Sequence, residues 1–289
     1  MQKTRIAMKS VTSGRFFITI FALVSLISPF IVSAETTLER IQRTGEVRIG
    51  YANEAPFAYS DLQGNVTGES PEIAKVVFAK MGVNKIDAVL TEWGALIPGL
   101  KANRFDVIAA GMYITPERMQ QVLFADPHYQ LGDTLLMRKD SLENLGSFAD
   151  IAKDPTLKLA VMAGTVEYDY AIAGGVDESQ ILQVPNTIAQ FQAVMTKRAD
   201  AAVGTRLTME DMANKSRGVL EAVADFTDDP AHIGYGALAF RLDDQDLRDA
   251  VNVILKEWIG SDEHLETVAP FGFDRSNLTD KTLADFVVP

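Results

Sequence analysis

From residue 45 onward, short apolar runs alternate with longer segments in which apolar residues recur every three or four positions. The runs with the length and composition of buried strands are residues 47–51, 86–90 and 106–110. Between the first two runs, Ile73, Val77 and Met81 mark one face of a helix. We expect this helix to begin at Ser70-Pro71, because serine caps helices and proline fits their first turn. The order strand, helix, strand predicts a parallel sheet with helices on its faces.

The same pattern begins again in the second half of the chain. Apolar runs at 158–162 and 199–203 predict two further strands, and the segment after Asn186 has the apolar repeat of a helix. A short helix is also expected at 93–102, between two strands of the first half. The sequence therefore predicts an α/β fold with two lobes of similar size.

Two segments are expected to connect the lobes, residues 129–132 and 233–236, because both are short and contain glycine. Two such crossings form a hinge, and they leave a cleft that can close on a ligand. We place lobe 1 at residues 35–130, lobe 2 at 131–232, and a return to lobe 1 at 233–289. The return segment includes an expected final helix that packs on lobe 1 through Leu247, Val251, Ile254 and Trp258.

Residues 1–34 have the pattern of a secretory signal peptide. Four basic residues and no acidic ones precede or flank the apolar segment 16–32, and Val32-Ser33-Ala34 matches a small-residue cleavage site. The alternative is a retained membrane anchor, which the short apolar segment and the cleavage pattern disfavour. We expect the remaining chain to be a periplasmic protein, and a monomer.

The amino-acid composition excludes or disfavours several classes of function. The chain has no cysteine, which excludes thiol catalysis, cysteine metal sites and a lipid-modified cysteine. Its net charge is −12, and about −16 without the basic leader, which disfavours nucleic acid as a partner. The histidines at 128, 232 and 264 lack metal-ligand spacing, and no phosphate-binding loop or Gly-x-Ser-x-Gly motif occurs. We expect no metal, no cofactor and no enzymatic activity.

The segment Gly111-Met112-Tyr113-Ile114-Thr115-Pro116-Glu117-Arg118 follows the buried run 106–110. An arginine at this distance beyond a strand end can point into a cleft, where its planar guanidinium suits one carboxylate through two parallel hydrogen bonds. Phe57, Trp93 and Tyr113 lie where the same cleft would be lined. Arg118 beside several aromatic rings predicts a pocket for a small zwitterion.

At this point the chain resembles the periplasmic solute-binding proteins of polar amino-acid ABC transporters, family 3. The matching motifs cover nearly the whole chain after the leader; they are Val47-Arg48-Ile49-Gly50, Ala55-Pro56-Phe57, Trp93-Gly94-Ala95-Leu96-Ile97-Pro98-Gly99-Leu100, Ile114-Thr115-Pro116-Glu117-Arg118, Phe124-Ala125-Asp126-Pro127 and Ala199-Asp200-Ala201-Ala202-Val203. The resemblance implies a two-lobe type II binding-protein fold, a small ligand in the cleft and an inner-membrane ABC permease as partner.

The resemblance also implies roles for particular residues. Arg118, at the end of the segment that includes Gly111 and Met112, would hold the ligand carboxylate, while Gly164 and Thr165 would donate hydrogen bonds from lobe 2. The ring of Trp93 would stack on the ligand from the side. The loop with Glu54 and Phe57 would supply a second ring, and Asn186 would be a further contact from lobe 2.

Two departures from the family pattern point to a particular ligand. The strand at 199–203 leads to Gly204-Thr205, where amino-acid binders have an aspartate that pairs with the α-ammonium group. Tyr113 stands where they usually have serine. A carboxylate site with added rings favours a delocalised or alkylated cation, which each ring stabilises by about 0.5–2 kcal/mol. Glu54, Phe57, Trp93 and Tyr113 resemble the ectoine and hydroxyectoine branch, in which an acid and three aromatic rings surround the ligand.

Alternatives stay open at this point. The ligand could be a betaine, or an amino acid whose ammonium group is held by Glu54. An enzyme such as a cyclohexadienyl dehydratase would need a carboxylic acid in the cleft, for which Glu167 is the candidate, and a detached sensor module shares the fold. The proposed site residues also have structural explanations: Arg118 or Thr165 as helix caps, the three rings as core, Glu54 as a solvated loop acid and Asn186 as a turn residue.

Overall fold

The computed structural model describes residues 34–141 and 145–286. Apart from Ala34, the predicted signal peptide therefore lies outside the described residues. Within the described ranges, no helix has the length and apolar character needed to cross a membrane.

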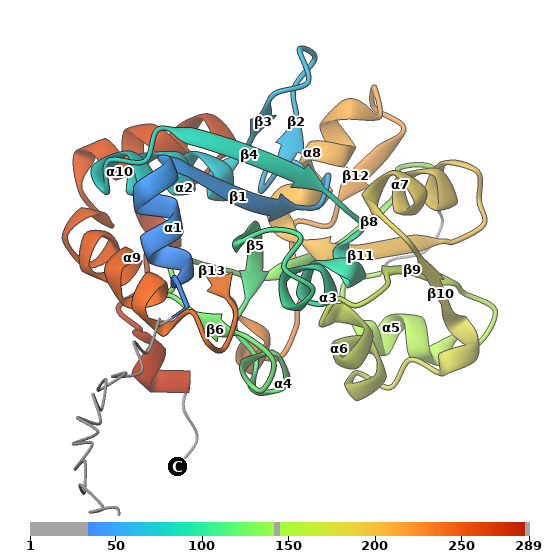
Figure 1. Ribbon diagram of the computed structural model, residues 1–289. Coiled ribbons are helices and arrows are strands. Elements are labelled where there is room, and N and C mark those ends of the chain that lie inside the picture. Colours follow the sequence, from blue (N-terminus) through green and yellow to red (C-terminus); the bar gives the residue numbers. More distant parts are fainter. Residues whose placement is uncertain (1–33, 142–144, 287–289) are drawn as a thin grey trace, which may run out of the picture. The chain divides into compact units, whose positions relative to one another are not determined.

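The first sheet has the strand order β4-β1-β5-β13-β6, and β7 also pairs with β13 (Figure 1). Its strands are β1 (Glu46–Tyr51), β4 (Lys85–Leu90), β5 (Val107–Tyr113), β6 (Leu123–Phe124), β7 (Tyr129–Leu131) and β13 (Gly234–Phe240). As the pattern predicted, β1 runs parallel to both β4 and β5. The sheet is nevertheless mixed, because β13 runs antiparallel to β5.

The second sheet has the order β10-β9-β11-β8-β12. Its strands are β8 (Asp133–Arg138), β9 (Leu159–Met162), β10 (Ile181–Val184), β11 (Ala201–Thr205) and β12 (Leu220–Ala222), while β2 (Tyr59–Ser60) and β3 (Val66–Thr67) form a separate hairpin. Here too the sheet is mixed, since β8 runs antiparallel to β11. We call the part of the chain built on the first sheet lobe 1 and the part built on the second sheet lobe 2.

Helices surround both sheets. Those of lobe 1 are α1 (Thr37–Thr44), α2 (Glu69–Lys80), α3 (Leu96–Lys101), α4 (Pro116–Met119), α9 (Gln245–Trp258) and α10 (Asp262–Val268), with short 3-10 turns η1 (Trp93–Ala95), η4 (Ala269–Phe271), η5 (Arg275–Asn277) and η6 (Leu283–Phe286). Those of lobe 2 are α5 (Phe148–Lys153), α6 (Glu167–Ala173), α7 (Thr187–Met195) and α8 (Arg206–Lys215), with η2 (Glu178–Gln180) and η3 (Pro230–His232).

The two crossings between the lobes lie side by side. β7 leads from the first sheet into β8 of the second, and β13 brings the chain back, with Gly234 opposite Leu131 and Gly236 opposite Tyr129. Both glycines are required by packing: a side chain at Gly234 would overlap the Tyr113 ring, and one at Gly236 would overlap the Tyr129 ring. The mixed sheets follow from these crossings, because β8 and β13 enter their sheets in the opposite direction.

Three expected boundaries differ from the structure. The α2 helix begins at Glu69 rather than with a cap at Ser70, because the amides of Glu69 and Ser70 donate to Pro56 O and Phe57 O, each at 3.1 Å. β5 continues through Tyr113, so that the first half of the arginine segment is strand. The helix α9 packs on lobe 1 as expected, but α10 and the later 3-10 turns follow it.

A buried carboxylate connects the N-terminal helix, the first sheet and the return segment in lobe 1. Asp106 is fully buried, and guanidinium nitrogens of Arg40 and Arg48 each lie 2.7 Å from its oxygens, with Arg241 at 3.5 Å. Burial alone would raise the pKa of Asp106, but the hydrogen bonds from Arg48 and Arg40 outweigh it and hold the pKa below its usual value.

We predict that Asp106→Asn lowers the free energy of unfolding by about 3–5 kcal/mol, because it breaks a buried ionic cluster and leaves the partly buried Arg40 and Arg48 without their counter-charge. Since the folded pKa of Asp106 is depressed, this stabilisation is present above the unfolded pKa and is lost as the pH falls below about 4. Urea denaturation at pH 7 measures it. The matched control is Asp249→Asn, which removes a half-exposed partner of Arg248 and should cost at most about 1 kcal/mol. Equal effects of the two variants would contradict this account.

Candidate functional site

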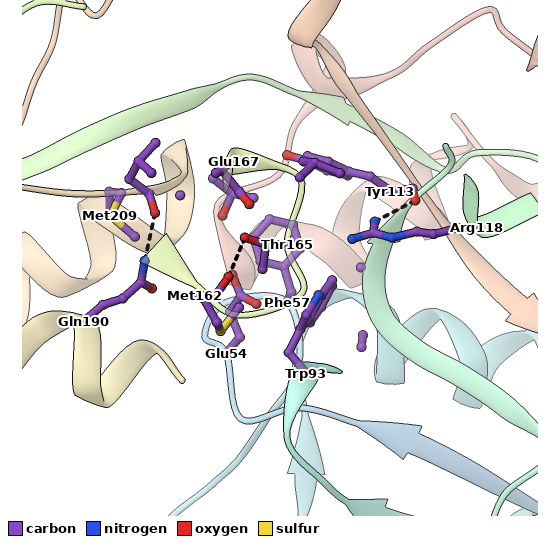
Figure 2. Close-up of a pocket in the computed structure, with 16 residues that line it drawn as sticks. Glu54, Phe57, Trp93, Tyr113, Arg118, Met162, Thr165, Glu167, Gln190 and Met209 are labelled. Carbon is purple, nitrogen blue, oxygen red and sulfur yellow. Dashed lines mark hydrogen bonds between the residues drawn. The ribbon is translucent and has the colours of Figure 1, made fainter. Parts of the chain in front are cut away.

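A pocket lies between the lobes and is lined by residues of both (Figure 2). Lobe 1 contributes the loop after β1, the turn η1, the end of β5 and the start of α4. Lobe 2 contributes the segment between β9 and α6, one side of α7 and the end of β11. Seven of the residues expected from sequence line it: Glu54, Phe57, Trp93, Gly111, Tyr113, Arg118 and Thr165.

Arg118 is positioned by the start of α4. Thr115 caps this helix, accepting a hydrogen bond from the Arg118 amide at 3.2 Å, and Pro116 occupies its first turn. The Arg118 side chain is only 8 % exposed. Its Nη1 donates to Tyr113 O at 2.9 Å, and its Nη2 donates across the cleft to Gly164 O at 3.3 Å.

The guanidinium of Arg118 has no carboxylate within 4 Å among the described residues. Burial lowers its pKa, although the more distant charge of Glu167 opposes this effect. A guanidinium has five N–H donors, and here two nitrogens bond to backbone carbonyls. Donors therefore remain for an anion that enters the pocket, and a carboxylate matches their planar arrangement.

Phe57 forms part of the pocket wall and also part of the core of lobe 1. Its loop is closed by reciprocal hydrogen bonds between Glu54 and Ala58, at 2.7 and 2.9 Å. Its ring lies 5.4 Å from the Tyr129 ring and 5.5 Å, edge to face, from the Phe273 ring. Gly111 allows this approach: it has a positive φ of 69°, and a side chain there would come within 2.5 Å of the Phe57 ring.

Two further rings line the pocket beside Arg118. The Trp93 indole donates from Nε1 to Gly164 O at 3.1 Å, and the Arg118 Cζ atom lies 5.7 Å from the centre of its rings. Tyr113 donates from its hydroxyl to Leu131 O at 3.3 Å, in the crossing strand β7. Both rings are held by hydrogen bonds at their polar ends and present apolar faces to the pocket.

Glu54 is a buried acid on the lobe 1 side of the pocket. Its Oε1 accepts a hydrogen bond from Thr208 at 3.1 Å, and the Thr208 hydroxyl accepts one from Thr205 at 2.9 Å. This chain of hydroxyl groups connects the lobes. Burial raises the pKa of Glu54 to about 8, and the charge of Glu167 adds to this shift.

Lobe 2 provides an acid of its own, the residue that sequence reasoning named as the cleft acid an enzyme would need but did not assign to a ligand. Glu167, in the first turn of α6, lines the pocket, is 5 % exposed, and has an Oε2 atom without a hydrogen-bond partner. Thr205 does occupy the end of β11, so the acid comes from a different element. Burial raises the pKa of Glu167, and it raises the pKa of nearby Asp133, at the start of β8, well above its usual value.

Three of the expected residues do not line the pocket. Met112 lies on the opposite side of β5 from Gly111 and Tyr113, paired with Ala237. Gly164 lies beside the pocket and accepts hydrogen bonds from Trp93 and Arg118 through its carbonyl oxygen. Asn186 caps α7 by accepting from the Ala189 amide at 3.0 Å, and it lines an adjoining groove that shares Glu54, Trp93 and Met162 with the pocket.

Thr165 lines the pocket but does not cap α6. Its hydroxyl donates to Met162 O at 2.9 Å, and the cap position of α6 belongs to Val166, which makes no side-chain hydrogen bond. Lining residues that sequence reasoning had not assigned to the ligand include Met162, Glu167, Gln190, Thr205 and Met209. The signal for Glu167 was its place in the first turn of a helix that follows a buried strand.

No group of three or more acidic, histidine or cysteine side chains able to hold a metal ion occurs among residues 34–141 and 145–286. What the pocket offers is therefore a fixed guanidinium, two carboxyl groups with raised pKa values and three aromatic rings. This arrangement can bind a small molecule with a carboxylate at one end and a cation at the other.

Known proteins resemble this chain over most of its length. The family model described as bacterial extracellular solute-binding proteins, family 3, matches residues 47–271. A probable amino-acid ABC transporter periplasmic-binding protein of Sinorhizobium fredii is 36 % identical over 259 residues, which are 87 % of this chain and 85 % of the relative.

Two solved structures share the fold. The structure of EhuB in complex with hydroxyectoine has a TM-score of 0.81 and 30 % identity, covering 87 % of this chain and 98 % of EhuB. The ancestral amino-acid-binding protein AncCDT-1, a precursor of cyclohexadienyl dehydratase, has a TM-score of 0.71 and 31 % identity, covering 82 % of this chain and 99 % of the ancestral one.

The raised pKa of Glu54 leads to a prediction for the ligand-free protein. Between about pH 5 and 8 the unfolded chain ionises Glu54 while the folded protein keeps it protonated, so the free energy of unfolding falls as the pH rises. Glu54→Gln should remove this fall: it should have little effect at pH 5 and should stabilise the protein by on the order of 3 kcal/mol at pH 8.5. Urea denaturation at both pH values measures the difference. The exposed Glu178→Gln is the control, and a Glu54→Gln profile parallel to that of the wild type would refute the assignment.

Proposed function

Because this chain belongs to the bacterial extracellular solute-binding proteins of family 3, we propose that its ligand is a small zwitterionic compatible solute of the ectoine or hydroxyectoine class. Proteins of this family bind small ligands and deliver them to ABC permeases. In this proposal the signal peptide directs the chain to the periplasm, where the protein works as a monomer and passes the solute to an inner-membrane permease. No chemistry takes place on the ligand.

One observation carries the proposal: a buried guanidinium without a carboxylate partner lies beside three aromatic rings. Arg118 would hold the carboxylate of the solute through donors that the chain leaves free. Phe57, Trp93 and Tyr113 would face its delocalised positive charge. The structural similarity to EhuB, whose structure contains hydroxyectoine, supports the same class of ligand.

The position of the pocket explains how binding would be linked to closure. Trp93 and Arg118 of lobe 1 both donate to Gly164 O of lobe 2, and Thr187 of lobe 2 donates to Asn53 O of lobe 1 at 3.2 Å. A ligand that touches both lobes stabilises the closed arrangement by its differential affinity for it. In this proposal the closed form is the one that the permease receives.

A cationic or polar amino acid is the alternative ligand, and the similarity to an ancestral amino-acid-binding protein favours it. Glu54 and Glu167 could pair with an α-ammonium group in place of the aspartate that the end of β11 lacks. Calorimetric titration with ectoine, hydroxyectoine and a panel of amino acids separates the two. Micromolar affinity for one amino acid, with none for ectoine, would establish the alternative.

A second candidate function is dehydration of a prephenate-like acid, favoured by one specific observation. Glu167 is a buried acid with a raised pKa in a pocket that also contains Arg118. It could protonate the leaving hydroxyl group, which departs as water while the ring carboxylate departs as CO2 and its bonding electrons complete the aromatic ring, and Arg118 could hold the side-chain carboxylate of the substrate. The protein can be incubated with prephenate or arogenate, and the loss of substrate can be followed by its absorbance. We expect no loss of substrate.

The role of Arg118 gives the first binding prediction. Arg118→Ala should weaken the affinity for ectoine by more than about 100-fold, because two charge-assisted hydrogen bonds are lost together. Isothermal titration calorimetry measures this. Arg198→Ala, which changes an exposed arginine of lobe 2, is the matched control and should bind as the wild type does. Retained affinity in Arg118→Ala would show that the carboxylate is held elsewhere.

The three aromatic rings that line the pocket give the second binding prediction. Tyr113→Ser should weaken ectoine binding by about 2- to 30-fold, which is the loss expected for one ring beside a delocalised cation. The affinity for an amino acid should fall by a smaller factor. Tyr113→Phe keeps the ring and removes only the hydroxyl bond to Leu131 O, so its affinity should stay near that of the wild type. If Tyr113→Ser binds ectoine as tightly as Tyr113→Phe does, the ring does not contribute.

A further inference from the structure

One carboxyl oxygen of Glu167 has no hydrogen-bond partner although the side chain is buried, and the group's other hydrogen-bonding interactions are with Thr165 and its own backbone amide. Glu167 comes from α6 in lobe 2, its Oε2 atom is the oxygen without a partner, and it lies beside Thr165 and Tyr113 in the pocket (Figure 2). A buried carboxyl oxygen without a donor loses its interaction with water and gains nothing in return. Such an atom, directed into a ligand pocket, is suited to accept an N–H group from the ligand.

Arg118 does not satisfy this carboxyl group. No oxygen of Glu167 lies within 4 Å of its guanidinium among the described residues, and the Arg118 donors that are engaged bond to Tyr113 O and Gly164 O. The pocket thus keeps its positive group and its acid of lobe 2 apart, which leaves both available to a ligand with charges of both signs.

Glu54 presents a second acid from the other lobe. Its Oε1 accepts the hydroxyl of Thr208, and in the described part of the chain no donor contacts its Oε2. Glu54 and Glu167 influence each other electrostatically, which shows in the pKa of Glu54. The two carboxyl groups, one from each lobe, therefore border the same space.

We propose that Glu54 and Glu167 each accept an N–H group from the cation of the ligand, so that the pocket selects cations with at least two N–H donors and rejects quaternary ammonium groups. The inference rests on the proposed function and narrows it. A cyclic amidinium has one N–H group on each side of its central carbon, so one N–H can point to the acid of lobe 1 and the other to the acid of lobe 2. A trimethylammonium group would satisfy neither carboxyl group, and its methyl groups would leave both acids buried without donors.

Proton release accompanies binding in this scheme. The charged and titratable groups that interact electrostatically with Glu167 are Glu54, Arg118, Tyr113, Tyr170 and Asp133, and Asp133 interacts in turn with Asp228. With several carboxyl groups near one guanidinium, burial raises the pKa values of Glu54, Glu167 and Asp133 and so favours their protonated forms in the empty pocket. A bound cation stabilises their ionised forms, so protons leave as the ligand enters, and affinity for the cation rises with pH.

The test is calorimetric titration of the wild-type protein with ectoine and with glycine betaine, at pH 7.5, in two buffers of different ionisation enthalpy. Both probes carry one carboxylate and one positive charge, and only ectoine has N–H donors on its cation. We expect at least about 100-fold tighter binding of ectoine, with net release of protons. Equal affinity for both probes, or no proton release with ectoine, overturns the inference and leaves the proposed function intact. No binding of ectoine overturns the proposed function and the inference together.

Glu167→Gln gives the residue-level test. It should weaken the affinity for ectoine by about 10- to 100-fold and reduce the number of protons released on binding. It should also reduce the ratio of the affinity for ectoine to the affinity for glycine betaine. Glu178→Gln, an exposed glutamate of the same lobe, is the matched control and should change none of the three. Unchanged affinity, proton release and preference in a folded Glu167→Gln protein would overturn the role of Glu167. If this variant does not fold, the two wild-type titrations still decide the question.

Discussion

The site depends on a buried guanidinium whose charge is not balanced by a carboxylate within reach. Removing a charge from water is costly unless hydrogen bonds and a counter-charge replace the lost hydration. Arg118 receives the hydrogen bonds, from Tyr113 O in its own lobe and Gly164 O across the cleft, but no described carboxylate lies within 4 Å of it. Asp106 shows the opposite case, a buried acid with three arginines around it. Lobe 1 therefore contains one completed ionic cluster, which serves stability, and one incomplete cluster, which is suited to a ligand.

The carboxyl groups in and near the pocket also contribute to its net charge. Burial raises the pKa values of Glu54 and Glu167 in the pocket and of Asp133 near it, which favours the uncharged forms of these acids in the empty pocket. A zwitterion would supply an anion to Arg118 and a cation to the acids in one step. Phe57, Trp93 and Tyr113 line the same buried space, where electrostatic interactions are stronger than in water. Selection among zwitterions then depends on the shape of the cation and on its N–H groups.

The pattern of apolar residues was sufficient to predict β1, β4, β5, β9 and β11, while the short glycine-containing segments indicated the crossings. The seven expected residues that line the pocket were predicted from the Arg118 segment and from the family resemblance. Sequence was not sufficient where contacts between distant segments decide the outcome. The start of α2 is set by Pro56 O and Phe57 O, and the continuation of β5 is set by its pairing with β13. Likewise, the absence of an aspartate at Thr205 and the presence of Glu167 as a candidate acid were visible in the sequence, whereas the fold was needed to place Glu167 in one pocket with Glu54.

The most direct measurement of the central claim is a crystal structure of the protein grown with ectoine. The account predicts that the ligand carboxylate lies about 3 Å from the guanidinium nitrogens of Arg118, with the ring of the ligand among Phe57, Trp93 and Tyr113. A structure in which the bound carboxylate contacts other groups, while Arg118 keeps only its two backbone carbonyl partners, would contradict it.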